Sequence, residues 1–169
     1  MAEHASPIRD IRRRLKQLRA DRASWDGHWR ELRDHVSPWS GNFADQGERA
    51  NDGGKKADPI ESAGREALRV MASGMQGGLT PRSVRWFGLK TRDPRVRDLP
   101  GAGAWLDECT QLILDILARS NFYHVQGQVY ESLGLFGTAA MYVEDDFDSV
   151  VRFKFLSTGE YWIADNWKG

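Results

Sequence analysis

The chain has 169 residues, 40% of them hydrophobic, and its 24 Lys and Arg balance 24 Asp and Glu to a formal net charge of zero. This is enough for one domain with its own core, and the charge balance gives no general affinity for nucleic acid or anionic membranes. One cysteine, Cys109, excludes an internal disulfide, no apolar run approaches the roughly 20 residues of a membrane span, and the N-terminus lacks a signal-peptide pattern.

The first predicted element is a long amphipathic helix within residues 1–36, running from Pro7 to Val36. Proline fits its first turn, and Pro38 ends its hydrogen-bond ladder. Apolar residues recur every three or four positions, with Arg22 as the one interruption. They form a seam of Ile8, Ile11, Leu15, Leu18, Trp25, Trp29, Leu32 and Val36. Two tryptophans are too wide for a regular two-stranded coiled coil, so we expect the seam to be buried in a larger assembly.

Charge is unevenly distributed along the chain. Residues 1–36 carry nine basic and six acidic side chains, whereas residues 138–169 carry three basic and six acidic ones. In a ring of copies, a basic edge would meet a neighbour's acidic edge, and a solvated scatter of charges is the alternative interpretation. The run Arg12-Arg13-Arg14 spreads around the helix, so it forms no single patch for DNA.

Residues 37–58 are predicted to form a loop, because they lack periodicity and are rich in Gly, Asn, Asp and Ser. A loop of this length inside a domain is typically functional or mobile. Gly53-Gly54-Lys55-Lys56 lacks the spacing of a phosphate-binding loop, and no apolar strand precedes it.

Residues 59–137 are predicted to be a helical region, and its first helix spans about Pro59 to Met75. Gly77 and Gly78 are expected to end this helix, with a positive φ at one glycine or both. Pro81 then turns the chain.

A short strand is predicted at residues 84–90. Trp86 and Phe87 are adjacent residues of this strand and point to its opposite faces, so we expect both faces of the strand to be covered.

Two amphipathic helices follow, from Ala104 to Ala118 and from Phe122 to Phe136. Ser120-Asn121 separates them, and Gly137 ends the second. Because their connection is so short, they are predicted to form an antiparallel αα-hairpin.

Residues 138–169 are predicted to form a β-hairpin or small sheet. Residues 138–144 and 150–156 alternate with period two around an acidic turn, and residues 160–164 form a third short strand. A turn signal at the very end predicts a sheet that is truncated at its last strand.

No motif in the chain predicts catalysis, a cofactor or a metal. His28 and His35 share a helix face and are interpreted as surface residues. The acidic turn at 144–148 lacks the glycine and distal glutamate of a calcium loop. Trp86 and Phe87 lie near Arg82 and Arg85, an arrangement that also occurs where single-stranded bases stack, but packing in the core is the favoured interpretation.

The order of these motifs resembles the head-to-tail connector, or portal, proteins of short-tailed double-stranded DNA phages. The match extends from Ile11 onward and is most specific over Gly77 to Phe87 and Ser120 to Tyr142. The resemblance singles out eight structural residues: Gly77, Gly78, Pro81, Trp86, Phe87, Ser120, Asn121 and Gly137.

The resemblance implies an α+β structural protein, helices first and an antiparallel sheet last, corresponding to the N-terminal portion of a longer subunit. Such subunits form a ring, a dodecamer in the full-length protein, through which DNA is packaged and ejected. The implied partners are capsid, packaging-motor and tail proteins and double-stranded DNA, with no membrane, no cofactor and no enzymatic activity. The implied location is the virion, after synthesis in the bacterial cytoplasm. The alternative function is a helical nucleic-acid-binding module that uses the basic positions from Arg9 to Arg33.

Overall fold

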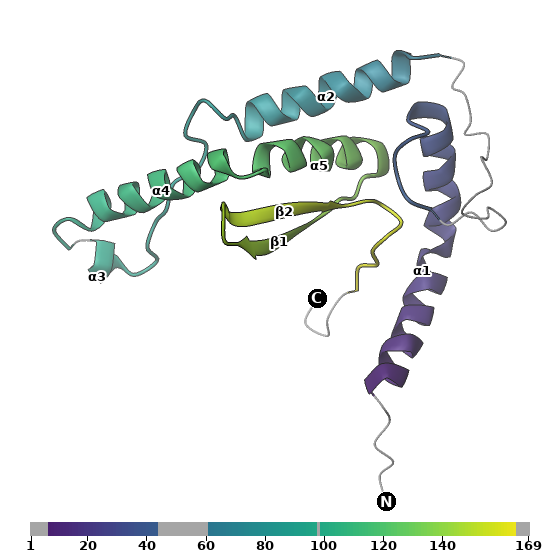
Figure 1. Ribbon diagram of the computed structural model, residues 1–169, viewed down its shortest axis with the longest axis horizontal. Helices are drawn as coiled ribbons and strands as arrows, with labels where there is room; N and C mark the ends of the chain where they lie inside the picture. The colour runs from purple at the N-terminus through teal and green to yellow at the C-terminus, as the bar shows by residue number, and fades with distance from the viewer. Residues whose placement is uncertain (1–6, 44–60, 98, 165–169) are drawn as a thin grey trace, which may run out of the picture.

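The computed structural model describes residues 7–43, 61–97 and 99–164. These residues form an α+β fold, as predicted, with α5 lying between α2 and a two-stranded hairpin (Figure 1). The elements in chain order are α1 (Pro7–Val36), α2 (Ala63–Leu79), α3 (Pro94–Arg97), α4 (Ala102–Arg119), α5 (Phe122–Phe136), β1 (Ala140–Asp146) and β2 (Val150–Leu156). Most of the loop predicted at 37–58 lies outside the described residues.

Helix α1 has the predicted bounds, and its apolar packing against the buried core is concentrated in its last third. Trp29, Leu32 and Val36 cover a buried cluster made by Phe43, Leu68, Leu135 and Phe136. At the other end the seam is bare, because Ile8 and Ile11 are 60% and 67% exposed. Helix α1 therefore projects from the body of the fold (Figure 1), and its apolar stripe is exposed at the free end.

Helix α5 pairs with α2, which corrects the predicted hairpin between the third and fourth helices. Helices α4 and α5 follow each other nearly end to end, and α2 runs antiparallel along α5 (Figure 1). Gly134 makes the close approach possible, because a Cβ there would lie 2.9 Å from the Leu68 side chain and would overlap Met71. Gln76 Nε2 donates a 2.8 Å hydrogen bond to the Tyr123 carbonyl at the other end of the pair.

The predicted glycine break at Gly77 and Gly78 is wrong. Both residues lie inside α2, which begins at Ala63 and continues to Leu79, and neither has a positive φ. A Cβ at either position would meet no atom within 4 Å. The helix ends at Thr80, next to Pro81, where the Thr80 hydroxyl hydrogen-bonds the Tyr130 hydroxyl at 3.1 Å. A buried polar partner and a proline end the helix, and glycine flexibility is not required.

Two predicted strands, 84–90 and 160–164, are absent from the described structure. Their backbone groups find side-chain partners instead of a sheet edge. The Leu89 N–H donates to Thr110 Oγ1 at 3.2 Å, and the Tyr161 carbonyl accepts a 2.7 Å hydrogen bond from Arg22. Local β-propensity is present in both segments, but within the described residues neither one pairs with a strand.

The hairpin pairs β1 with β2 in an antiparallel register that aligns Ala140 with Leu156 and Asp146 with Val150. The first strand begins and ends two residues later than predicted. Phe153 is buried from the sheet face against Phe122 and Val125 of α5, and these three form the second apolar cluster. The hairpin thus covers the side of α5 that α2 leaves open.

Candidate assembly site

The predicted residues Trp86 and Phe87 lie in an aromatic junction where the chain between α2 and α3 crosses the start of α5. The Trp86 ring stacks on Phe122 at a centroid distance of 6.1 Å and an interplanar angle of 4°. Phe87 meets the same indole edge to face at 4.8 Å. Trp86 Nε1 also donates to the Tyr123 hydroxyl at 3.3 Å. These contacts support the packing interpretation of the aromatic pair.

The two arginines beside this pair are engaged by protein groups. Arg82 donates to the Ala118 carbonyl at 3.1 Å, and Arg85 forms an ion pair with Asp107 at 2.8 Å. Arg85 also donates to the Phe87 carbonyl at 3.1 Å. This arrangement ties the crossing segment to α4 and leaves the aromatic faces covered by other rings, which does not favour stacking of nucleic acid bases.

Asn121 connects the helical layer to the hairpin. Its amide donates from Nδ2 to the Phe153 carbonyl at 2.7 Å and accepts at Oδ1 from the Phe153 N–H at 2.9 Å. Ser120 precedes it and accepts the Phe122 N–H at 3.2 Å through Oγ. The Asn121 side chain therefore binds the backbone N–H and carbonyl of Phe153 at the middle of β2, in the way that a neighbouring strand would.

Gly137 occupies the turn from α5 into β1 with φ 71°, and its N–H donates to the Leu133 carbonyl at 3.0 Å. Ser132 stands on the inner face of this turn and donates to the Thr138 carbonyl at 2.9 Å. Its hydroxyl also meets that of Thr158, which is 1% exposed, at 3.0 Å. The other predicted residues, Gly77 and Gly78, are exposed on α2 and are not brought to this junction.

Sequence reasoning missed the junction between α1 and the segment after β2. Arg22 fills the gap in the apolar seam, and its guanidinium lies 4.6 Å from the centre of the Trp162 ring. Arg19 lies over the same ring at 5.1 Å. Arg22 also approaches Asp26 at 2.8 Å, as an ion pair without hydrogen-bond alignment. The interruption at Arg22 was visible in the sequence, whereas its partner lies 139 residues away at Tyr161.

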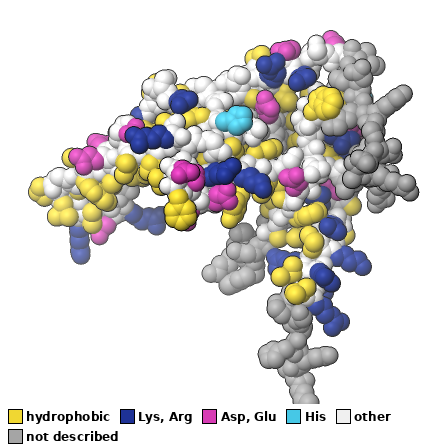
Figure 2. Space-filling model, viewed as in Figure 1, with side chains coloured by type: hydrophobic (Ala, Val, Ile, Leu, Met, Phe, Trp, Pro, Cys, Tyr) yellow, Lys and Arg dark blue, Asp and Glu magenta, His cyan; other side chains and the backbone are white. Residues whose placement is uncertain are grey.

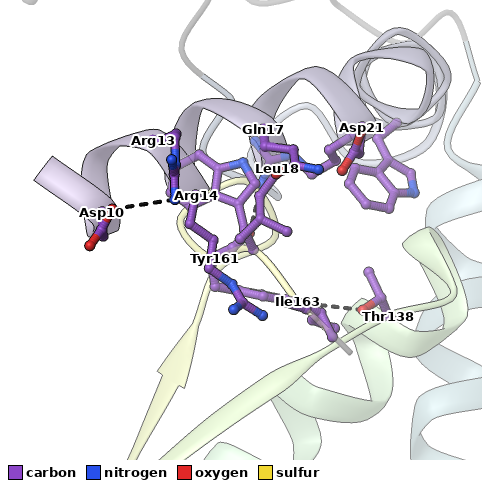
Figure 3. A pocket seen from close by; sticks show the side chains of 13 residues that line it. Asp10, Arg13, Arg14, Gln17, Leu18, Asp21, Thr138, Tyr161 and Ile163 are labelled. Carbon is purple, nitrogen blue, oxygen red and sulfur yellow. Dashed lines mark hydrogen bonds and ion pairs between the residues drawn. The ribbon is translucent and has the colours of Figure 1, made fainter. Parts of the chain in front are cut away.

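A pocket of about 770 Å³ opens beside this junction, between α1 and residues 161–164 (Figure 3). Leu18, Trp162 and Ile163 supply apolar surface, and Arg13 and Gln17 stand along the helix side. The Trp162 indole N–H is buried and meets no hydrogen-bond acceptor among the described residues. The pocket combines apolar area with charges of both signs, since Asp10 and Asp21 line it beside three arginines.

Among residues 7–43, 61–97 and 99–164, no three His, Cys, Asp or Glu side chains gather in a way that could hold a metal ion. In the same part of the chain, no helix combines the length and hydropathy needed to cross a membrane. Exposed apolar side chains lie on several parts of the described structure, among them the free end of α1, helix α4 and the hairpin. Such side chains are available for contacts with other proteins.

Comparison with known proteins places the chain among phage head-to-tail connecting proteins. The family model described as "Bacteriophage head to tail connecting protein" matches residues 9–169, and the chain belongs to this family. The resemblance inferred from the sequence motifs is thereby confirmed.

Two curated relatives are portal proteins. The "Probable portal protein" of Bordetella phage BPP-1 is 42% identical over 157 residues, which cover 92% of this chain and 28% of the relative. The "Portal protein" of Salmonella phage epsilon15 is 31% identical over 157 residues, covering 93% of this chain and 28% of the relative. The chain therefore spans about a quarter of the length of these relatives.

Proposed function

We propose that this chain is part of a structural subunit of a phage portal, the ring that connects head and tail and through which DNA is packaged and ejected. The observation that carries the proposal is the half-covered helix α1, whose apolar seam is packed at Trp29 and bare at Ile8 and Ile11. A stripe that continues past the edge of its own fold is suited to burial against another subunit.

The other contacts described above fit a structural role, because they connect elements of the fold to one another. Ring stacking at Trp86, the Asn121 contacts to β2 and the Ser132–Thr158 pair each connect one element to another. The two described apolar clusters share α5, so α2, α1 and the hairpin are all held by one helix. We assign no chemical step to the chain, and its proposed partners are further copies of itself, capsid and tail proteins, and the DNA that passes through the ring.

A nucleic-acid-binding module built on α1 is the second candidate function. Residues 9–19 hold six basic side chains and one acidic one, and Arg13 is exposed, with Asp10 as an ion-pair partner at 3.3 Å. Binding by these residues would weaken steeply as salt concentration rises. Tight, salt-sensitive binding of duplex DNA by a monomeric protein would favour this candidate over the portal.

The test is electron microscopy and multi-angle light scattering of the protein expressed from its complete open reading frame. We expect a closed ring of identical subunits, twelve by the family resemblance, and phage particles that fail to package DNA when the gene is deleted. A protein that stays monomeric at micromolar concentration, together with normal packaging in the deletion strain, would overturn the proposal.

A further inference from the structure

The tip of the hairpin presents one aromatic side chain within an acidic rim. Phe147 is fully exposed at the turn between β1 and β2. The rim consists of Glu144, Asp145, Asp146 and Asp148. Solvation alone does not explain a phenylalanine at this position, because its ring gains nothing from water.

The turn is held in a defined shape. Ser149 Oγ donates to Asp146 Oδ2 at 2.6 Å, and the Asp148 N–H donates to Asp146 Oδ1 at 3.4 Å. These hydrogen bonds, led by that from Ser149, hold the pKa of Asp146 below its ordinary value, so this carboxylate keeps its charge in mildly acidic solution. Val150 completes the turn with φ 70°, a left-handed conformation that a β-branched residue rarely adopts. The backbone of the tip therefore needs little further ordering when it binds a partner.

The pocket beside α1 is complementary in polarity and charge to the hairpin tip. Its apolar surface comes from Leu18, Trp162 and Ile163, and three arginines among its lining residues outnumber Asp10 and Asp21. The helix that forms its wall is strongly basic over residues 9–19, and Lys and Arg side chains gather around the projecting end of α1 (Figure 2). An aromatic ring with carboxylate neighbours matches both the apolar floor and the net positive charge of the residues that line the pocket.

A chain cannot place its own tip in its own pocket. In the described structure neither β1 nor β2 contacts α1, and the turn of the hairpin points away from that helix (Figure 1). Two different surfaces that recognise each other produce a head-to-tail contact, and repetition of such a contact closes a ring when the rotation permits.

We propose that the hairpin tip of one subunit, led by Phe147, docks into the pocket between α1 and residues 161–164 of the next subunit. The inference rests on the proposed portal function, which supplies the neighbouring copy. It names the two surfaces that meet, and it places Leu18 of the α1 seam in the interface.

Site-directed cross-linking in the assembled protein tests this contact. In a Cys109→Ser background, Asp148→Cys beside the retained Phe147 is combined with Gln17→Cys in the pocket. Mild oxidation is expected to give a ladder of disulfide-linked multimers on a non-reducing gel. The matched control replaces Gln17→Cys with Lys16→Cys, one position along α1 and outside the residues that line the pocket, and is expected to give monomers.

A second measurement keeps the tip itself under test. Phe147→Ser is expected to raise the subunit concentration needed for half assembly by about tenfold or more, as loss of an anchoring aromatic does. Val143→Ser, at another exposed apolar position of the same hairpin, is expected to leave that concentration unchanged.

Rings that form without the 148–17 cross-link, or that assemble normally with Phe147→Ser, would overturn the docking and leave the portal function standing. The docking is also overturned if the thiol introduced at position 17 is shielded from alkylation only when DNA is added, because DNA would then occupy the pocket. Failure of the parent protein to form rings would instead overturn the proposed function and this contact together.

Discussion

Replacing Asn121 by alanine is expected to loosen the hairpin from the helical layer. The amide makes two hydrogen bonds to one residue, to the Phe153 carbonyl at 2.7 Å and from the Phe153 N–H at 2.9 Å. Phe153 is 7% exposed, so its backbone groups lie where water reaches poorly. A lost hydrogen bond costs about 0.5–1.5 kcal/mol, and more where the remaining partner is buried.

We expect Asn121→Ala to lower the free energy of unfolding by about 1–2 kcal/mol, the lower part of the sum for two such bonds, because the asparagine itself is solvent-exposed. For a domain of this size each kcal/mol lowers the melting temperature by about 2–4 °C, so a decrease of several degrees should be seen. Urea unfolding followed by circular dichroism gives the free energy, and amide hydrogen exchange at Phe153 reports the local opening.

Asn42→Ala is the matched control, because that exposed amide makes one side-chain hydrogen bond, to Glu160 at 2.8 Å. Its expected cost is below about 0.5 kcal/mol. Asn121→Asp is the sharper variant, since it keeps an acceptor for the Phe153 N–H but sets a carboxylate against the Phe153 carbonyl. If Asn121→Ala unfolds like Asn42→Ala and exchange at Phe153 is unchanged, the clamp does not hold the hairpin and the reasoning fails.

The remaining predictions concern local conformation and burial. Gly77→Ala and Gly78→Ala should each raise the free energy of unfolding by about 0.5–1 kcal/mol, because both glycines are exposed inside a helix with room for a Cβ, and a lower melting temperature would show that the helix requires them. Val150→Gly should raise the melting temperature of the protein, because glycine adopts the left-handed backbone at φ 70° without strain. A melting temperature that is unchanged or lower would mean that the conformation carries little strain. Trp29→Phe should cost about 1–2 kcal/mol, since it removes the 3.1 Å hydrogen bond from Nε1 to the Phe136 carbonyl but keeps most of the apolar contact, and Trp29→Ala should cost more, an order that urea unfolding of both variants checks.

The sequence alone determined the elements whose signals are local. Helix α1 has its predicted bounds because apolar residues recur at helical spacing over 30 residues, from Pro7 to the position before Ser37-Pro38. Helix α5 has its predicted bounds because Phe122 begins a periodic run that Gly137 ends. The hairpin was also predictable, to within two residues, from alternation around an acidic turn. Family membership was predictable for the same reason, since it rests on short runs of neighbouring residues.

Tertiary structure decided whatever depends on a distant partner. Gly77-Gly78 has the composition of a helix stop, yet the helix continues until Thr80 meets Tyr130, 50 residues away. Residues 84–90 have strand propensity, but no strand pairs with them in the described structure. Helix α5 packs on α2 more than on α4, and Gly134 leaves room there for the Leu68 and Met71 side chains.

The candidate site divides in the same way. Phe147 and its acidic neighbours are contiguous in sequence, whereas Arg22 reaches Trp162 and Tyr161 only when the chain folds back on α1. Propensity and periodicity act over a few residues and leave a trace in the sequence, but packing complementarity joins surfaces whose residues have no relation along the chain. For this reason the elements with strong local signals could be predicted from the sequence, whereas the fold decided which of them meet and which segments of strand propensity stay unpaired.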